Sequence, residues 1–268
     1  MSMGKSVLEK FFGGNRKAVV VAVDHGEFDG PIPGMIDLPV AIYQVKGADG
    51  ILMSPGMFER CKKFFMQRNA PVPIVRINWS TTYCFKWKYN KSISVKVQSP
   101  ERAKAMGARM VLIALHLHTG SEEQDAKNVE VFSRLCNEAK KINIPVMGEY
   151  FPNEVDKLTP EQLHEEIYTG CRIAAELGAD CIKTFYTNNF GEVTGSCPVP
   201  ILGLGAEKLP KEIQALELAD SIIKDGGRGV VFGRNVMQAK NPSKFLKALL
   251  DVVKKGMNPE TAAKKYCL

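Results

Sequence analysis

The stretch from Ala179 to Phe190 reads Ala-Asp-Cys-Ile-Lys-Thr-Phe-Tyr-Thr-Asn-Asn-Phe. Its apolar part lies between Gly178 and the polar run that begins at Thr187, which predicts a short buried strand. Lys183 lies within this strand. Burying an ammonium group is costly unless the group is paired or loses its proton. Such a lysine is either neutralised by a carboxylate or serves as a nucleophile that adds to a carbonyl and forms an imine.

Similar apolar runs recur along the chain about every 25 to 35 residues, with amphipathic helical patterns between them. The predicted strands are 18–24, 50–53, 74–78, 110–116, 144–150, 181–186, 199–202 and 229–232. They are nearly continuous in apolar character, as expected of a parallel sheet covered on its outer face. The order predicts one α/β domain over residues 1–268, a (β/α)8 TIM barrel. An open doubly wound sheet is the alternative, but its Gly-x-Gly-x-x-Gly turn is absent after the first run.

Local signals place some helix starts and one irregular segment. Ser99-Pro100 and Thr159-Pro160 each put a capping hydroxyl before a proline, and Gln162 completes a capping box in the second case. The aromatic and basic stretch 79–97 follows the third strand. It predicts an extended loop or a small hairpin at the mouth of the barrel.

The composition indicates a large core and no targeting segment. Hydrophobic residues make up 45% of the 268 residues, and the formal net charge is +7. The basic residues are dispersed among acidic ones, which favours an anionic small molecule or a solvated surface over nucleic acid. No apolar run reaches about 18 residues, so no membrane segment is expected. Seven scattered cysteines without a Cys-x-x-Cys pair are typical of a reducing compartment, and we expect a cytoplasmic protein.

Polar residues at the carboxyl ends of barrel strands are the candidates for chemistry. Asp24 and His25 follow the first strand and would act as an acid/base pair, or else as a turn cap and a packed ring. Glu149 on the fifth strand would be the charge partner of Lys183 or a general base. Tyr150 would face the interior only if a bulge turned it inward.

Two further strand ends supply candidate binding residues. Arg76 lies at the end of the third strand, and His116 and His118 lie at the end of the fourth. At a spacing of i, i+2 both imidazoles would face the same way, as polar pocket residues or as two ligands of a zinc ion. No convincing third ligand is nearby in the sequence, so we expect no metal.

The last two strands end in loops suited to an anion. Their glycines would let backbone amides approach a phosphate, and an arginine would add a bidentate donor. The residues concerned are Gly203, Gly205, Gly233 and Arg234.

Four motifs together resemble a known family, the archaeal-type class I fructose-bisphosphate aldolases and their relatives. They are Val-Asp-His-Gly at 23–26, Ile-Lys-Thr-Phe-Tyr at 182–186, Cys-Pro-Val-Pro-Ile at 197–201 and Phe-Gly-Arg-Asn at 232–235. The resemblance implies a (β/α)8 barrel in a homo-oligomer, often a decamer. It also implies Lys183 as the Schiff-base lysine and Asp24 as an active-site acid. The phosphate-binding residues that it implies are Gly203, Gly205, Gly233 and Arg234.

Two details separate the branches of this family. Residues 24–31 and 195–200 look closest to the thiolase branch that degrades a phosphorylated pentanedione, in which the equivalent of His25 takes part in catalysis. The aldolase and synthase branches carry a proton-donating tyrosine in a Tyr-Pro-Arg-Gly pattern, where this chain has Phe151. Glu149 resembles the strand-five glutamate of tagatose-bisphosphate aldolases.

These observations predict a class I aldolase-type lyase that makes or breaks a carbon–carbon bond in a phosphorylated ketose such as fructose bisphosphate. Lys183 would form the imine, with no further cofactor, and the expected partner is a phosphorylated small molecule rather than nucleic acid or a membrane. One alternative is acyl transfer on a phosphorylated diketone, with coenzyme A as co-substrate. Another is a phosphosugar-binding barrel without catalysis.

Overall fold

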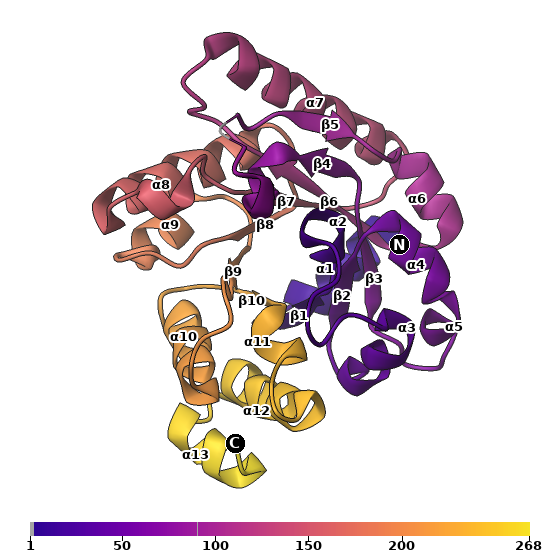
Figure 1. The fold of residues 1–268 in the computed structure, drawn as a ribbon, viewed down its shortest axis with the longest axis vertical. Helices are drawn as coiled ribbons and strands as arrows, with labels where there is room; N and C mark the ends of the chain where they lie inside the picture. Colours follow the sequence, from indigo (N-terminus) through magenta and orange to yellow (C-terminus); the bar gives the residue numbers. More distant parts are fainter. Residues whose placement is uncertain (1–2, 90) are drawn as a thin grey trace.

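The computed structural model describes residues 3–89 and 91–268, which form a closed barrel of eight parallel strands (Figure 1). The (β/α)8 prediction is therefore confirmed, and each predicted strand is present within a few residues of its expected bounds. In order around the barrel the strands are β1 (Ala18–Ala22), β10 (Gly229–Phe232), β9 (Ile201–Leu204), β8 (Cys181–Thr184), β7 (Val146–Tyr150), β6 (Met110–Leu115), β3 (Val72–Arg76) and β2 (Gly50–Met53).

Helices follow the strands and cover the outer face of the barrel (Figure 1). The Thr159 capping box is confirmed, and the Ser99 hydroxyl accepts the amide of Arg102. The α-helices are α1 (Met3–Phe12), α2 (Gly26–Asp29), α3 (Leu38–Ala41), α4 (Pro55–Arg60), α5 (Lys62–Phe65), α6 (Pro100–Met106), α7 (Glu122–Lys141), α8 (Pro160–Glu176), α9 (Phe190–Ser196), α10 (Glu212–Lys224), α11 (Arg234–Met237), α12 (Pro242–Lys255) and α13 (Pro259–Tyr266). Short 3-10 turns are η1 (Ile42–Val45), η2 (Thr81–Tyr83), η3 (Phe85–Trp87) and η4 (Val155–Lys157).

The side chains of each strand alternate between the barrel interior and the layer under the helices, because successive residues of a strand point to opposite faces. On β7, Met147 belongs to the inner cluster and Tyr150 to the outer one. On β8, Cys181 is inner and Ile182 outer. The same alternation directs Glu149 and Lys183 inward, and these two residues are partners in the β7–β8 register.

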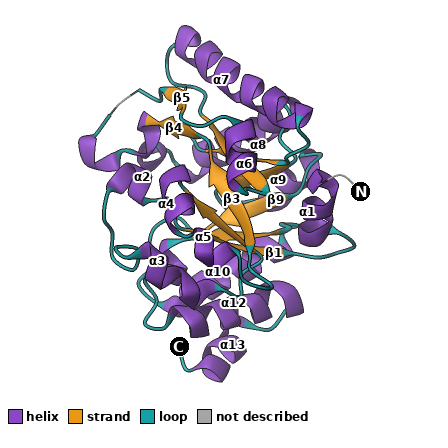
Figure 2. Cartoon of the chain, turned by 90° about the vertical axis from the view of Figure 1, so that its right-hand side faces the viewer, coloured by secondary structure: helices purple, strands orange, loops and turns teal. Residues whose placement is uncertain are grey.

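The two ends of the barrel are closed differently. At the amino ends of the strands, Val7 and Phe11 of α1 pack against the inward-facing side chains. α2 lies on the other side of the strands (Figure 2). The described residues of the segment 79–97 form a hairpin, with β4 (Asn78–Ser80) antiparallel to β5 (Ser94–Lys96). Within the described ranges no helix is long and apolar enough to cross a membrane.

Candidate active site

A cavity of about 620 Å³ lies at the carboxyl ends of the strands. This volume suits a small metabolite. Four charged side chains form its floor: Asp24 beyond β1, Arg76 on β3, Glu149 on β7 and Lys183 on β8. Each is at least 93% buried, with exposed fractions of 4%, 2%, 1% and 7% respectively. The closed barrel brings these strands together, and strand alternation directs the side chains of residues far apart in the sequence into one cavity.

These four side chains are joined by direct ion pairs. Lys183 Nζ lies 2.5 Å from Glu149 Oε1, and Arg76 Nη2 lies 2.5 Å from Glu149 Oε2. Arg76 Nε also lies 2.7 Å from Asp24 Oδ2. Two carboxylates and two cations thus neutralise one another in a site with little access to water. Buried charges require this kind of pairing.

The pairing sets the protonation of the two carboxyl groups. Burial alone would raise the pKa of Glu149, but the positive charges of Arg76 and Lys183 outweigh it and lower the pKa below its ordinary value. The pKa of Asp24 is lowered for the same reason, with Arg76 as the main positive neighbour. Both groups are therefore carboxylates at neutral pH and can accept protons.

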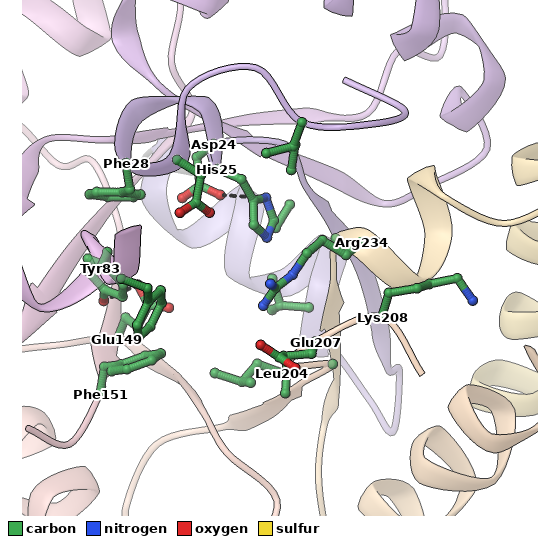
Figure 3. A pocket seen from close by; sticks show the side chains of 18 of the residues that line it. Asp24, His25, Phe28, Tyr83, Glu149, Phe151, Leu204, Glu207, Lys208 and Arg234 are labelled. Atoms are coloured by element: carbon green, nitrogen blue, oxygen red, sulfur yellow. Dashed lines mark hydrogen bonds and ion pairs between the residues drawn. The ribbon is translucent and has the colours of Figure 1, made fainter. Parts of the chain in front are cut away.

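His25 lies beside this cluster as a neutral imidazole. Its Nδ1 atom is 3.9 Å from Asp24 Oδ1 (Figure 3). Burial is the largest effect on the ring and lowers its pKa to about 4, against the opposing effect of Asp24. Among the described residues, none forms a hydrogen bond with the buried Nδ1 atom. The ring lines the cavity, with the buried Nδ1 atom on the side of Asp24.

Tyr83 is a site residue that the sequence analysis missed. It lies on η2, within the hairpin segment, and its hydroxyl donates to Glu149 Oε2 at 2.8 Å. Arg76 stacks over its ring, with 4.8 Å between the guanidinium carbon and the ring centroid. Burial raises the pKa of Tyr83 well above its ordinary value, so the phenol stays protonated. The aromatic richness of residues 79–97 was the available signal, but no periodicity there indicated which ring enters the site.

The opposite side of the cavity carries the glycines and the arginine that the sequence analysis associated with phosphate. Gly205, Gly233 and Arg234 all line the cavity. A Cβ atom on Gly233 would lie 2.3 Å from the His25 ring, so only glycine fits there. Arg234 points into the cavity (Figure 3). Its buried Nε atom has no hydrogen-bond partner in the described part of the chain.

Two further predicted residues face away from the cavity, for reasons of strand geometry. Tyr150 follows Glu149 and points outward, where its hydroxyl donates to Glu166 of α8 at 2.9 Å. No bulge turns it inward, so its predicted catalytic place is wrong. Gly203 on β9 also faces outward, and a Cβ atom there would lie 2.4 Å from Ile222 of α10. The missing side chain therefore allows close packing of α10, and Gly203 does not line the cavity where phosphate was expected.

The expectation for the histidines after β6 is corrected too. β6 ends at Leu115, and His118 has a φ of 55°, so the two rings do not share one strand face. His116 is buried with Nδ1 at 2.8 Å from the Phe151 carbonyl oxygen. His118 is exposed, and its Nδ1 lies 2.5 Å from Glu166 Oε1. The predicted binding role of His118 is therefore wrong.

The remaining predictions concern Arg76 and metal binding. Arg76 was predicted to bind substrate, and this stays a prediction: its Nε and Nη2 atoms contact Asp24 and Glu149, and its buried Nη1 atom has no partner among the described residues. We interpret it as the residue that holds both carboxylates in place. In the ranges 3–89 and 91–268, no three or more His, Cys, Asp or Glu side chains are grouped so that they could hold a metal ion.

Comparisons with known proteins place this geometry in context. Residues 18–239 match the DeoC/LacD family aldolase model. An aldolase of Saccharolobus solfataricus, described as uncharacterized, is 32% identical over 88% of this chain and 89% of its own length. A 3-hydroxy-5-phosphonooxypentane-2,4-dione thiolase of Yersinia enterocolitica is 31% identical over 93% of this chain and 81% of its own. The structure of an archaeal fructose-1,6-bisphosphate aldolase, with its catalytic lysine bound to a carbinolamine intermediate, superimposes with a TM-score of 0.79 at 27% identity, covering 93% of this chain and 99% of that one.

Proposed function

Since this chain belongs to the DeoC/LacD family of aldolases, we propose that it is a class I lyase that cleaves or forms a carbon–carbon bond in a phosphorylated ketose through an imine at Lys183. The observation that carries the proposal is the contact of 2.5 Å between Lys183 Nζ and Glu149 Oε1 on the floor of the cavity. An amine beside a carboxylate has both the nucleophile and the proton acceptor that imine formation needs.

Imine formation begins when Lys183 passes an ammonium proton to Glu149. The free amine adds to the ketone carbonyl, and the resulting carbinolamine loses its hydroxyl as water when Glu149 returns the proton. The product is a positively charged iminium bonded to Nζ. Removing the proton from Lys183 also removes one of the positive charges that lower the pKa of Glu149, so the carboxylate becomes a better base as it is needed.

Bond cleavage then uses the iminium as an electron sink. The bond between the carbons α and β to the imine carbon breaks, and its electron pair forms the enamine. The hydroxyl proton on the β carbon goes to Glu149, or to His25 or Asp24 nearby, and the β carbon leaves as an aldehyde. The enamine takes up a proton at the α carbon, and water hydrolyses the iminium to return the ketone and free Lys183.

The phosphate of the substrate would bind on the side of Gly205, Gly233 and Arg234. The backbone of the two glycines is open to a ligand, and the guanidinium of Arg234 is a suitable partner for two phosphate oxygens. A formal net charge of +7 would also favour the approach of an anion.

The test is borohydride reduction in the presence of dihydroxyacetone phosphate, fructose bisphosphate or a panel of other phosphorylated ketones. Intact mass followed by peptide mapping should locate a reduced adduct on Lys183 and none in a Lys183→Met variant. If no ketone in the panel gives an adduct, the imine mechanism is wrong. A non-catalytic phosphosugar-binding role would then account for the cavity.

A second candidate is acyl transfer from a phosphorylated diketone to coenzyme A. The similarity to the thiolase of Yersinia enterocolitica favours it. So does His25, because a neutral imidazole that lines the cavity can take the proton from an attacking thiol. The two candidates differ in one requirement: turnover of a phosphorylated diketone that depends strictly on coenzyme A would support acyl transfer, and turnover without it would support the aldolase.

A further inference from the structure

The two walls of the cavity differ in chemical character. One wall is aromatic and joins Phe28, Tyr83, Phe85, Phe151 and Phe185. Figure 3 shows Phe28, Tyr83 and Phe151 on the side opposite Arg234 and Lys208. The proposed mechanism uses the charged floor and the cationic wall but assigns nothing to the aromatic wall.

The aromatic wall is continuous from ring to ring. Phe28 and Tyr83 have ring centroids 4.6 Å apart, and those of Tyr83 and Phe151 are 4.9 Å apart. Phe151 and Phe185 follow at 4.8 Å, and Phe85 lies 6.2 Å from Phe151. These spacings are those of edge-to-face and tilted aromatic pairs, which hold each other in fixed orientations.

Strand geometry places this wall directly beyond the reacting groups. Phe151 lies two residues after Glu149, and Phe185 lies two residues after Lys183, so each ring is one step further along the inward-facing row. A ketone bonded to Lys183 has two substituents on its carbonyl carbon. If the phosphate-bearing substituent lies toward Arg234, the other substituent must extend over Phe151 and Phe185.

Apart from Arg234, the cations of the described cavity lining have partners within the protein. Arg76 and Lys183 are paired with the floor carboxylates, although the Nη1 atom of Arg76 has no partner. Lys86 donates to the carbonyl oxygen of Asp29, and Lys208 donates to that of Leu209 at 3.0 Å. Of the charged groups in the described lining, the carboxylate of Glu149 lies two residues before Phe151 and that of Asp156 five residues after it. Neither carboxylate would favour a phosphate there.

We propose that the half of the substrate that leaves as an aldehyde carries no phosphate and ends in an apolar, preferably aromatic, group held by Phe151, Phe185 and Phe85. This rests on the proposed aldolase function and narrows it, because the ketose would have one phosphate, on the half that stays bonded to Lys183. A second phosphate, as in fructose bisphosphate, would have to bind against aromatic rings, and Lys86, which already donates to the Asp29 carbonyl oxygen, would be the cation next to Phe85.

The experiment is run in the direction of bond formation. Dihydroxyacetone phosphate, or whichever ketone of the panel gives the Lys183 adduct, is supplied as the donor. Phenylacetaldehyde and glyceraldehyde 3-phosphate then compete as acceptors, and the products are quantified by mass spectrometry. We expect a kcat/KM at least tenfold higher for phenylacetaldehyde.

Matched variants locate the effect. Phe185→Ser, and independently Phe151→Leu, should raise KM for phenylacetaldehyde about tenfold while the rate of borohydride trapping of the donor stays the same, because donor binding uses the other wall. Trp87→Leu serves as the control, since Trp87 is exposed on η3 and does not line the cavity. It should change neither quantity.

The outcomes separate this inference from the proposal beneath it. If a donor adduct forms on Lys183 but glyceraldehyde 3-phosphate is the better acceptor, or both Phe variants leave KM for phenylacetaldehyde unchanged, the inference is wrong and the aldolase function stands. If no donor adduct forms at all, both are wrong.

Discussion

Two glutamates of this barrel have similar partners in opposite environments. Glu149 accepts hydrogen bonds from Lys183, Arg76 and Tyr83 inside the barrel, where it is 1% exposed. Glu166 of α8 contacts His118 through one oxygen and accepts from the Tyr150 hydroxyl through the other, on the outside. The sequence analysis assigned members of both groups to one active site, and the structure separates them.

The difference lies in what each group can reach. The partners of Glu149 line a cavity, and removing any of them leaves an unpaired buried group. The partners of Glu166 link the end of β7 to the outer helix layer, and His118 has an 81% exposed side chain. An exposed pair of this kind contributes little to stability. The same residue types therefore have different consequences according to the face of the barrel on which they lie.

The largest expected difference between the two groups is in catalysis. Lys183→Ala should lower kcat/KM on the order of a thousandfold or more, because no other amine can take over the imine. Glu166→Ala should leave kcat/KM within about twofold. Steady-state kinetics on the ketose identified by trapping measures both, with circular dichroism to show that each variant folds. Near-full activity of folded Lys183→Ala, or a large loss of activity in Glu166→Ala, would contradict the assignment of the Glu149 group to catalysis and of the Glu166 group to the outer layer.

The loss of a buried ion pair should lower the free energy of unfolding much more than the loss of an exposed one. Arg76→Met leaves Asp24 and one oxygen of Glu149 buried without their cation, which should cost about 3–5 kcal/mol in the free energy of unfolding. Arg172→Met, which removes an exposed pair with Glu176 on α8, should cost less than about 0.5 kcal/mol. Denaturant unfolding at neutral pH compares the two variants.

The pH dependence of that loss has a definite sign. In the native protein the pKa values of Asp24 and Glu149 are lowered, so both stabilise the fold above the unfolded-state values of about 4 and lose this effect as the pH falls below them. In the Arg76→Met variant, burial without the cation would raise the pKa of Asp24. The free energy of unfolding of this variant would therefore fall as the pH rises. The difference in the free energy of unfolding between the native protein and Arg76→Met should therefore be larger at pH 8 than at pH 5. A gap that does not change with pH would mean that Arg76 acts mainly through packing.

The fold could be predicted from the sequence because its signals are local and repeated. Apolar runs, amphipathic helical patterns and capped helix starts recur along the chain at the spacing of βα units, and each depends on neighbouring residues only. The charged floor was also predictable in part, because Asp24, Glu149 and Lys183 stand at strand ends in a predicted barrel.

The wrong predictions concern features that short sequence motifs do not determine. Tyr150 would have needed a bulge to face inward, and no local signal shows whether a bulge is present. Gly203 lies one residue from the inward-facing Leu202, and the sequence did not show which of the two residues faces inward. His118 was placed on a strand that ends three residues earlier. Tyr83 comes from a hairpin whose position depends on contacts far along the chain, such as the Asn78 side chain on Ala114 of β6. Tertiary contacts of this type have no local signature.

Tyr83 and Tyr150, which donate to Glu149 and Glu166 respectively, give a finer test of the difference between the two glutamates. Tyr83→Phe removes a hydrogen bond to the charged Glu149, a loss of about 1.5–3 kcal/mol, and should lower kcat about tenfold or more. Tyr150→Phe removes the equivalent bond to Glu166 and should leave kcat unchanged. The Tyr83 bond helps to lower the pKa of Glu149, so its loss should move the acid limb of the kcat–pH profile to higher pH. A fall in kcat without this movement would show that Tyr83 acts by another route.

The smallest effect is expected at His118, the residue whose predicted site role the structure rejects. The hydrogen bond with Glu166 raises the pKa of His118, so the protonated ring stabilises the fold below its ordinary value of about 6.5 and this effect disappears as the pH rises through the raised pKa. Because the side chain is largely exposed, screening by solvent should keep the effect under about 0.5 kcal/mol. His118→Ala should thus lower the unfolding temperature slightly at pH 5.5, leave it unchanged at pH 8.5, and leave kcat/KM unchanged at both. A tenfold loss of kcat/KM would instead return His118 to the active site and require the loop after β6 to close over the cavity when substrate binds.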